Sequence, residues 1–217
     1  VVDLLRRARQ HCLDIAKAIY NHDYQVSDRV VNARIHAAIE LLLTTGEEQY
    51  RNYLIQNKKA VIEGLNQTGW LIGRALPKIN NADFTASVKT SVKVVSDEIA
   101  KLSAETPFGV PYRPHIWGAG WNLQSFGVRQ YYLYKAFPDI FSPDPIFNAL
   151  NFILGVHPGE NTSSFASGVG VRSATIAYGI NRADESYIPG GVASGTALIR
   201  PDFPELLDWP YLWQQQE

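Results

Sequence analysis

The sequence predicts an all-α fold of antiparallel helical hairpins that carry long loops at one end, as in an α/α toroid. Two observations predict it. Residues 1–105 place apolar side chains at helical spacing, in stretches separated by turns of three to five residues. Residues 106–121 and 155–204 instead show no helical period and are rich in Gly, Pro, Ser and aromatic residues. Loops this long inside a compact domain are usually functional. We expect a single domain, residues 1–217, with its site on these loops.

The first helix is predicted by an apolar stripe that runs from Leu4 to Ile19 and ends at the cluster Asn21-His22-Asp23. Cys12 lies in this stripe, so we expect it to be a small core residue. A single cysteine allows no internal disulfide.

Five further helices follow from the same spacing and from capping residues. Ser, Asp and Asn favour the N-cap because their side chains accept a hydrogen bond from the first turn, and proline is favoured directly after it. The second helix is apolar on more than one face, as expected of a helix buried between layers. The expected helices run from Ser27 or Asp28 to Leu43, from near Glu47 through Leu65, from Asn81 or Asp83 to Leu102, from Asn122 to about Phe137, and from the cap Asp144 with Pro145 to Leu154.

Composition excludes several classes of partner. Twenty Lys and Arg against 21 Asp and Glu give a net charge of −1, whereas nucleic acid or an anionic membrane surface calls for a basic face. No apolar run approaches the ~20 residues that span a membrane. None of the five His lies at metal-ligand spacing, so we expect no metal site and no cofactor. Calcium is left open, because no acidic run has the density of an oxygen cage.

Aromatic residues gather in the loop before the fifth helix. Trp117 and Trp121, with Tyr112 and His115, are able to line a sugar-binding groove, because indole faces stack on the apolar faces of sugar rings. The same residues are equally suited to plugging the end of the helical layer. Both interpretations stay open.

The long loop carries Arg172, Tyr178, Arg182 and Asp184. Arginines there hydrogen-bond sugar hydroxyls or hold the loop together through an Arg–Asp pair, and we expect the structural pair for at least one of them. The serines at 163–170 suggest a nucleophile or a phosphate loop only weakly. They have neither a strand–GxSxG–helix context nor a P-loop lysine.

The last residues, 211–217, combine aromatic side chains with a final carboxylate, Glu217. A glycosidase holds its proton donor beside the glycosidic oxygen, and burial next to an aromatic such as Trp213 would raise the pKa of Glu217 as that role requires. The alternative is a solvated glutamate at a frayed end.

Several of these pieces occur in a recognisable order. They are Trp117-Gly-Ala-Gly120, Asn151-Phe-Ile-Leu-Gly-Val-His-Pro158, Ser164-Phe-Ala-Ser-Gly-Val-Gly170, Ile188-Pro-Gly-Gly191 and Trp213-Gln-Gln-Gln-Glu217. In this order they resemble the C-terminal part of the catalytic domain of glycoside hydrolase family 9, a family of inverting β-glucanases on an (α/α)6 barrel. The resemblance covers residues 100–217, and residues 1–99 match only as generic barrel helices.

The resemblance implies a set of roles. Glu217 would be the general acid, and Trp117, Trp121 and Trp213 would stack on sugar rings. Arg182, Arg172, Tyr178 and His115 would contact the substrate, a polysaccharide or oligosaccharide. It also implies a secreted or periplasmic protein.

Three departures from the family shape these expectations. Gln216 stands where the family usually has Asn, and the stretch Ala177–Arg182 replaces a "PHHR"-like sugar-binding motif, of which only Arg182 carries over. The Asp-rich motif of the catalytic base is not present. Inversion needs both an acid and a base, so we expect the base in a missing N-terminal part of the same domain, and no activity from these 217 residues alone. The alternatives are a phosphorylase, epimerase or lyase on a similar barrel, or a helical module that binds glycans without cleaving them.

Overall fold

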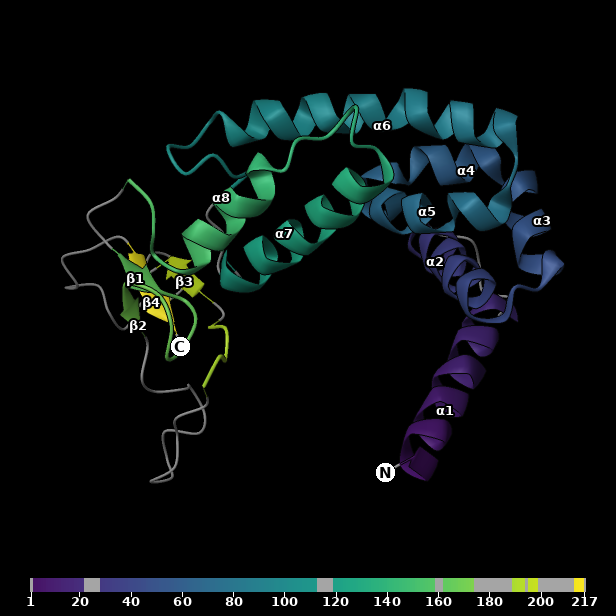
Figure 1. Cartoon of the computed structure of the whole chain (residues 1–217), viewed down its shortest axis with the longest axis horizontal. Coiled ribbons are helices and arrows are strands. Elements are labelled where there is room, and N and C mark those ends of the chain that lie inside the picture. Colours follow the sequence, from purple (N-terminus) through teal and green to yellow (C-terminus); the bar gives the residue numbers. More distant parts are fainter. Residues whose placement is uncertain are drawn as a thin grey trace. The chain divides into compact units, whose positions relative to one another are not determined.

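The described chain consists mainly of helices, with short strands in its C-terminal part (Figure 1). The structure is a computed structural model that describes residues 2–21, 28–112, 119–158, 162–173, 189–193, 195–198 and 213–216. The helices are α1 (Val2–Asn21), α2 (Asp28–Thr45), α3 (Glu48–Gln56), α4 (Lys58–Glu63), α5 (Leu65–Ile79), α6 (Ala82–Ser103), α7 (Ala119–Ala136) and α8 (Asp144–Ile153). The strands are β1 (Ser163–Ser164), β2 (Arg172–Ser173), β3 (Gly195–Leu198) and β4 (Trp213–Gln216).

The all-α class is confirmed, because the strands are short additions to a helical chain. None of the helices in these ranges is both long enough and apolar enough to cross a membrane.

The chain divides into two compact units. Unit 1 is Val1–Asp97 with Tyr132–Phe141, and unit 2 is Glu98–Tyr131 with Ser142–Glu217. The single domain over residues 1–217 stays a prediction.

Two neighbouring helices of unit 1, α2 and α5, run in the same direction. The Asn32 side-chain amide donates to the Gln67 side chain (3.1 Å), and two turns further along both helices Arg74 donates to Glu40 (2.6 Å). Residue numbers rise together across the contact, so the helices are parallel. Parallel neighbours need a return segment, which α3 and α4 provide between them.

Helix α5 is also parallel to the last turns of α7. A side-chain carbon at Gly69 would lie 3.7 Å from Leu133, and one at Gly73 would lie 2.7 Å from the Cβ of Ala136 and 3.2 Å from the Phe137 ring. Numbers again rise together, and α6 lies between α5 and α7 in the chain. Helices that alternate with return helices in this way are the hairpins that the sequence predicts.

The helix expected from Glu47 through Leu65 is wrong as a single element, because it divides into α3, α4 and the start of α5. Asn57 leaves helical geometry (φ −99°, ψ 27°) and its side chain donates to the Tyr53 carbonyl (2.8 Å). Gly64 forms the second break (φ −89°, ψ 5°). A Cβ at Gly64 would lie 2.5 Å from Oδ1 of Asn32, so the break lets the chain pass close to α2.

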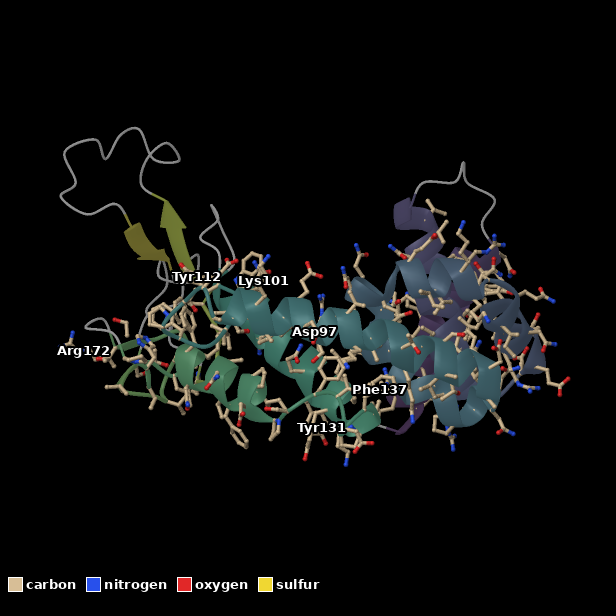
Figure 2. All side chains as sticks on the ribbon, turned by 90° about the horizontal axis from the view of Figure 1, so that it is seen from above. Asp97, Lys101, Tyr112, Tyr131, Phe137 and Arg172 are labelled. Carbon is tan, nitrogen blue, oxygen red and sulfur yellow. The ribbon has the colours of Figure 1, made fainter. Side chains whose placement is uncertain are left out.

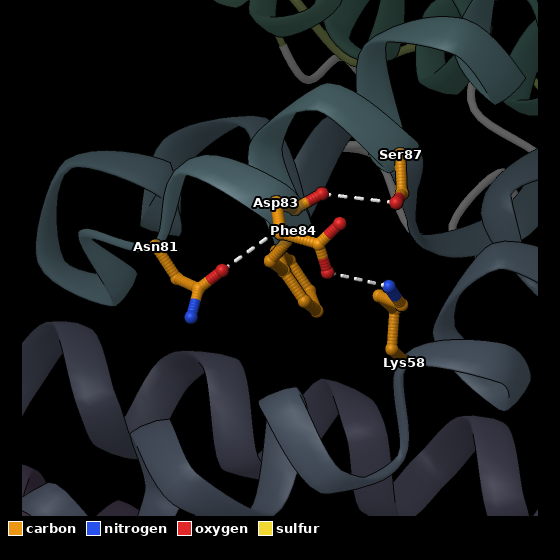
Figure 3. Close-up of polar contacts among 5 residues, drawn as sticks. All are labelled: Lys58, Asn81, Asp83, Phe84 and Ser87. Carbon is orange, nitrogen blue, oxygen red and sulfur yellow. Dashed lines mark hydrogen bonds and ion pairs between the residues drawn. The ribbon is translucent and has the colours of Figure 1, made fainter.

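The start of α6 shows which of two predicted caps is used (Figure 3). The Asn81 carboxamide oxygen accepts the backbone N–H of Phe84 (2.8 Å), so Asn81 is the cap. Asp83 instead pairs with Lys58 (2.7 Å), and its carbonyl accepts the Ser87 hydroxyl (2.9 Å).

Two other helix boundaries differ from the prediction. Helix α7 begins at Ala119 rather than at Asn122. In α8 the expected cap Asp144 is already helical and the cap position is Pro143. The Ser142 hydroxyl accepts a hydrogen bond from the Asp144 N–H (3.0 Å). Ser142, which precedes the cap position Pro143, thus satisfies one of the free N–H groups of the first turn.

An aromatic cluster around Arg34 attaches helix α1 to the rest of unit 1. The Arg34 side chain donates to the Tyr20 carbonyl (2.7 Å), and its guanidinium lies 5.4 Å from the Tyr20 ring and 5.6 Å from the Tyr53 ring. Tyr20 also meets Tyr50 edge to face (5.1 Å). Burial, the largest cause, raises the pKa of Tyr53, and the nearby guanidinium opposes that rise.

The prediction that Cys12 is a core residue is wrong, because this thiol is exposed. Helix α1 packs against α2, and the half-buried residues of α1 are Leu13, Ala16, Lys17 and Tyr20. Cys12 belongs to the adjacent face, so a single neighbouring helix does not cover it.

The close approach at Gly73 leads to a prediction about stability. Gly73→Ala puts a methyl group against Ala136 and Phe137, so we expect the free energy of unfolding to fall by about 1–3 kcal/mol. Gly69→Ala is the matched control on the same helix. Its methyl group meets only ordinary contacts, and alanine's helix propensity is better by about 1 kcal/mol, so we expect no loss. Urea unfolding of both variants measures this, and equal effects would contradict the proposed close contact.

Candidate functional site

The loop segments of unit 2 rest on an aromatic cluster centred on Phe152 of α8, which is only 4% exposed. Its ring stacks on Phe165 (centroids 5.5 Å apart) and on His157 (5.7 Å). Phe108 meets it edge to face at 5.1 Å, and Tyr112 lies 5.2 Å away. Tyr112 therefore packs against the core of unit 2, which is the plugging role considered for the loop aromatics. Tyr112 is labelled in Figure 2.

The chain reverses direction directly after α8 at Gly155. This residue has a positive φ (70°), and its N–H bonds to the Phe152 carbonyl (3.2 Å) while the Val156 N–H bonds to that of Asn151 (2.8 Å). The two bonds form a Schellman motif, which ends the helix. A Cβ at Gly155 would overlap with the carbonyl oxygen of Thr162, so glycine also admits the returning chain.

The returning chain forms a small platform anchored by the buried Ser164. Strand β1 pairs in parallel with β2, with Ser163 opposite Arg172. The Ser164 hydroxyl accepts the Ala166 N–H (3.0 Å) and lies within donating distance of the Ile153 carbonyl (3.3 Å). Ser164 is fully buried. Because its hydroxyl is bound to backbone groups, it is an anchor and not a nucleophile.

A second segment, residues 189–193, joins this platform to the start of α7. The Ser167 N–H bonds to the Gly191 carbonyl (2.9 Å), and the Ala193 N–H bonds to that of Phe165 (2.7 Å). A Cβ at Gly120 of α7 would overlap with the Ala193 carbonyl oxygen. The backbone of α7 therefore approaches the segment 189–193 closely at Gly120, one residue before Trp121.

Two predicted site residues are described with their side chains, and both are on unit 2. Trp121 is 52% exposed in the first turns of α7, although an indole tends to be buried in a protein. Arg172 is exposed in β2, and Figure 2 shows its side chain extending away from the ribbon. Both are therefore accessible to a ligand, and no Arg–Asp pair holds Arg172 among the described residues.

The remaining predicted site residues lie outside the described residues. They are His115, Trp117, Tyr178, Arg182 and Glu217, and for Trp213 the backbone alone is described. Asp184, the acidic residue of the Arg–Asp pair considered for the long loop, also lies outside the described residues.

The backbone leading to Glu217 belongs to a hairpin. Strand β4 pairs antiparallel with β3, with Trp213 opposite Leu198 and Gln216 opposite Gly195. The residue that precedes Glu217 is therefore held in a ladder of hydrogen bonds. Sequence reasoning missed this hairpin, because Trp213–Gln216 has only four residues and three of them are glutamines.

The search for metal-ligating residues in the described part of the chain finds no group of three or more His, Cys, Asp or Glu that could hold an ion. Of the predicted site residues described with side chains, Trp121 offers aromatic stacking and the exposed Arg172 offers hydrogen bonding.

The contact between Gly120 and Ala193 leads to a second prediction. Gly120→Ala drives a methyl group into a backbone carbonyl, so either α7 shifts or residues 189–193 detach, and we expect a loss of about 2–3 kcal/mol. Gly127→Ala on the same helix is the control, since its Cβ would meet only the Ala149 methyl group at 3.2 Å. Hydrogen exchange should show faster exchange of the Ala193 amide in Gly120→Ala alone. An unchanged rate there would show that this contact does not hold the segment.

No family model and no curated protein matches the chain. Solved structures that are similar to it include GH family 9 endoglucanase J30 and a Zn-binding triple mutant of that endoglucanase. The first matches with a TM-score of 0.61 and 22% identity over 82% of this chain, and the second with 0.59 and 22% over 80%. Each match covers 35% of the other chain, so this chain spans about a third of their length. The chain is thus similar in fold to about a third of a family 9 endoglucanase, a family of (α/α)6 barrels.

Proposed function

We propose that the chain is the C-terminal portion of a glycoside hydrolase catalytic domain that cleaves a β-linked glucan or related oligosaccharide with inversion. The observation that carries this proposal is the fold, which is similar to that of an endoglucanase over 82% of the chain. The ordered motifs of residues 117–217 add to it, since fold alone does not assign an activity. Polysaccharide or oligosaccharide is the substrate class, and the protein acts outside the cell or in the periplasm.

Trp121 and Arg172 are the described residues that support a sugar site. An exposed indole offers the flat apolar surface on which a pyranose ring stacks, and an exposed guanidinium donates several hydrogen bonds to hydroxyls. In the proposal Trp117 and Trp213 add stacking surfaces, and His115, Tyr178 and Arg182 add hydrogen bonds.

Glu217 is the proposed general acid, which protonates the departing glycosidic oxygen. Support comes from β4, whose pairing with β3 restrains the residue before it. A catalytic carboxyl must be held close to the position that the reaction requires, and a residue next to a paired strand is restrained better than one at a free chain end.

The proposed mechanism also requires a base on the opposite face of the sugar. The two carboxyls must be roughly 6.5–9.5 Å apart so that a water fits between them. We propose that an N-terminal part of the same domain supplies this base, which agrees with a match that covers only 35% of the endoglucanase chains. These 217 residues alone then bind sugar without releasing product.

Replacement of Glu217 tests the acid directly. In the longest natural polypeptide we expect Glu217→Gln to lower turnover by about 10²–10⁴-fold on unactivated oligosaccharides, because the leaving oxygen loses its proton donor. Glycosides with an acidic phenol as the leaving group need little protonation, so their hydrolysis should fall much less. Glu63→Gln, a carboxylate in an exposed pair with Lys59, is the control and should change nothing. An unaffected rate with Glu217→Gln would refute the assignment.

The stereochemistry of the product tests the reaction class. We expect proton NMR of the same polypeptide, with a panel of β-linked oligosaccharides, to show the α-anomer first. The β-anomer appearing first would exclude inversion. Turnover that depends on phosphate, or a product without a new reducing end, would indicate a phosphorylase or a lyase, and binding without cleavage would indicate a glycan-binding module.

A further inference from the structure

Strands β1 and β2 form a pair whose two faces differ. Side chains alternate between the faces of a strand, so Ser163 and Arg172 share one face, and Ser164 and Ser173 share the other. Ser164 is fully buried and Ser173 is half-buried, whereas Arg172 is exposed. The pair therefore turns two hydroxyl groups inward and one guanidinium outward.

The direction of the Arg172 side chain depends on the register of this pair. A slip of one residue would turn the side chain to the inner face. Each strand has only two residues, which is shorter than strands usually are, so backbone pairing alone fixes the register weakly. Among the described residues no ion pair holds the guanidinium either. Other contacts must therefore hold β2 in place.

The two inner hydroxyls supply such contacts. The Ser164 hydroxyl accepts the Ala166 N–H (3.0 Å), which fixes the chain directly after β1. A Cβ at Gly170 would lie 2.6 Å from Oγ of Ser164, so the loop before β2 packs directly on this side chain. The Ser173 hydroxyl accepts the Gly168 N–H, which closes the same loop from its other end. Both serines thus hold the loop that leads into Arg172.

We infer that Ser164 and Ser173 are positioning residues for sugar recognition, and that they act through Arg172. This inference rests on the proposed function, in which the guanidinium of Arg172 donates hydrogen bonds to sugar hydroxyls. A guanidinium presents its donors in a fixed fork, so it meets a ligand well only where the backbone that carries it stays in place. Ser164 cannot reach a ligand itself, because it is fully buried.

A double-mutant cycle separates this role from a merely structural one. Every variant is made in the longest natural polypeptide with Glu217→Gln, so that sugar is cleaved too slowly to disturb calorimetric titration with cellotetraose or laminaritetraose. We expect Arg172→Ala to raise the dissociation constant about tenfold, as the loss of a charged hydrogen bond does. Ser164→Ala should raise it at least about threefold when Arg172 is present. It should leave the constant unchanged when Arg172 is replaced by alanine.

Thr68→Val is the matched control. The Thr68 hydroxyl is also buried and donates to a backbone carbonyl, that of Gly64 (3.0 Å), but it lies in α5 of unit 1. We expect Thr68→Val to lower the urea midpoint of unfolding, as Ser164→Ala does, without changing the dissociation constant. Ser173 is only half-buried, so Ser173→Ala repeats the cycle even where Ser164→Ala does not fold. Its effect should show the same dependence on Arg172.

Equal effects of the serine variants with and without Arg172 would overturn the positioning role, because the loss would then not pass through the guanidinium. An unchanged dissociation constant in both serine variants would overturn it as well. Sugar release by the polypeptide with Glu217 intact tests the proposed function separately. Binding that follows the cycle without any release contradicts only hydrolysis, and release with additive effects contradicts only the positioning role. Binding of neither tetrasaccharide contradicts both.

Discussion

Unit 2 depends on close backbone contacts at glycines, where any larger residue would place its Cβ on a neighbouring segment. Three glycines make this possible, because the space for their missing Cβ is filled by a carbonyl oxygen of another segment. The pairs are Gly120 with Ala193, Gly155 with Thr162 and Gly170 with Leu154. Together they bring the start of α7, the end of α8 and two loop segments into direct contact. The exposed Trp121 and Arg172 are carried by segments that these contacts hold.

Helices were predictable because their apolar spacing is local. Their existence follows from the sequence, and the cap at Asn81 follows from capping chemistry. The breaks at Asn57 and Gly64 were not predictable, because the Gly64 break reflects the passage of another helix beside it. The exposure of Cys12 was missed for a related reason. A stripe shows that a helix has an apolar face, without showing whether another segment of the chain covers that face.

The candidate site was less predictable than the fold. Its aromatic and charged residues can be chosen from chemistry and from family resemblance, but the pairing that holds them connects distant residues. Ser163 meets Arg172, and Gly195 meets Gln216, through strands of two to four residues. Strands this short have no periodicity to detect. The serine-rich loop shows the same limit, since only burial identifies Ser164 as an anchor.

The hairpin of β3 and β4 has a consequence for how such a protein varies over evolution. Its register joins Leu198 to Trp213 across a connection whose length does not affect the ladder itself. The entropy of closing a loop grows only slowly with loop length, by about 0.6 kcal/mol for each doubling. Residues can therefore be inserted or lost between 198 and 213 while Gln216 keeps its partner. The fold thus allows the length of this connection to change independently of the strand that precedes Glu217.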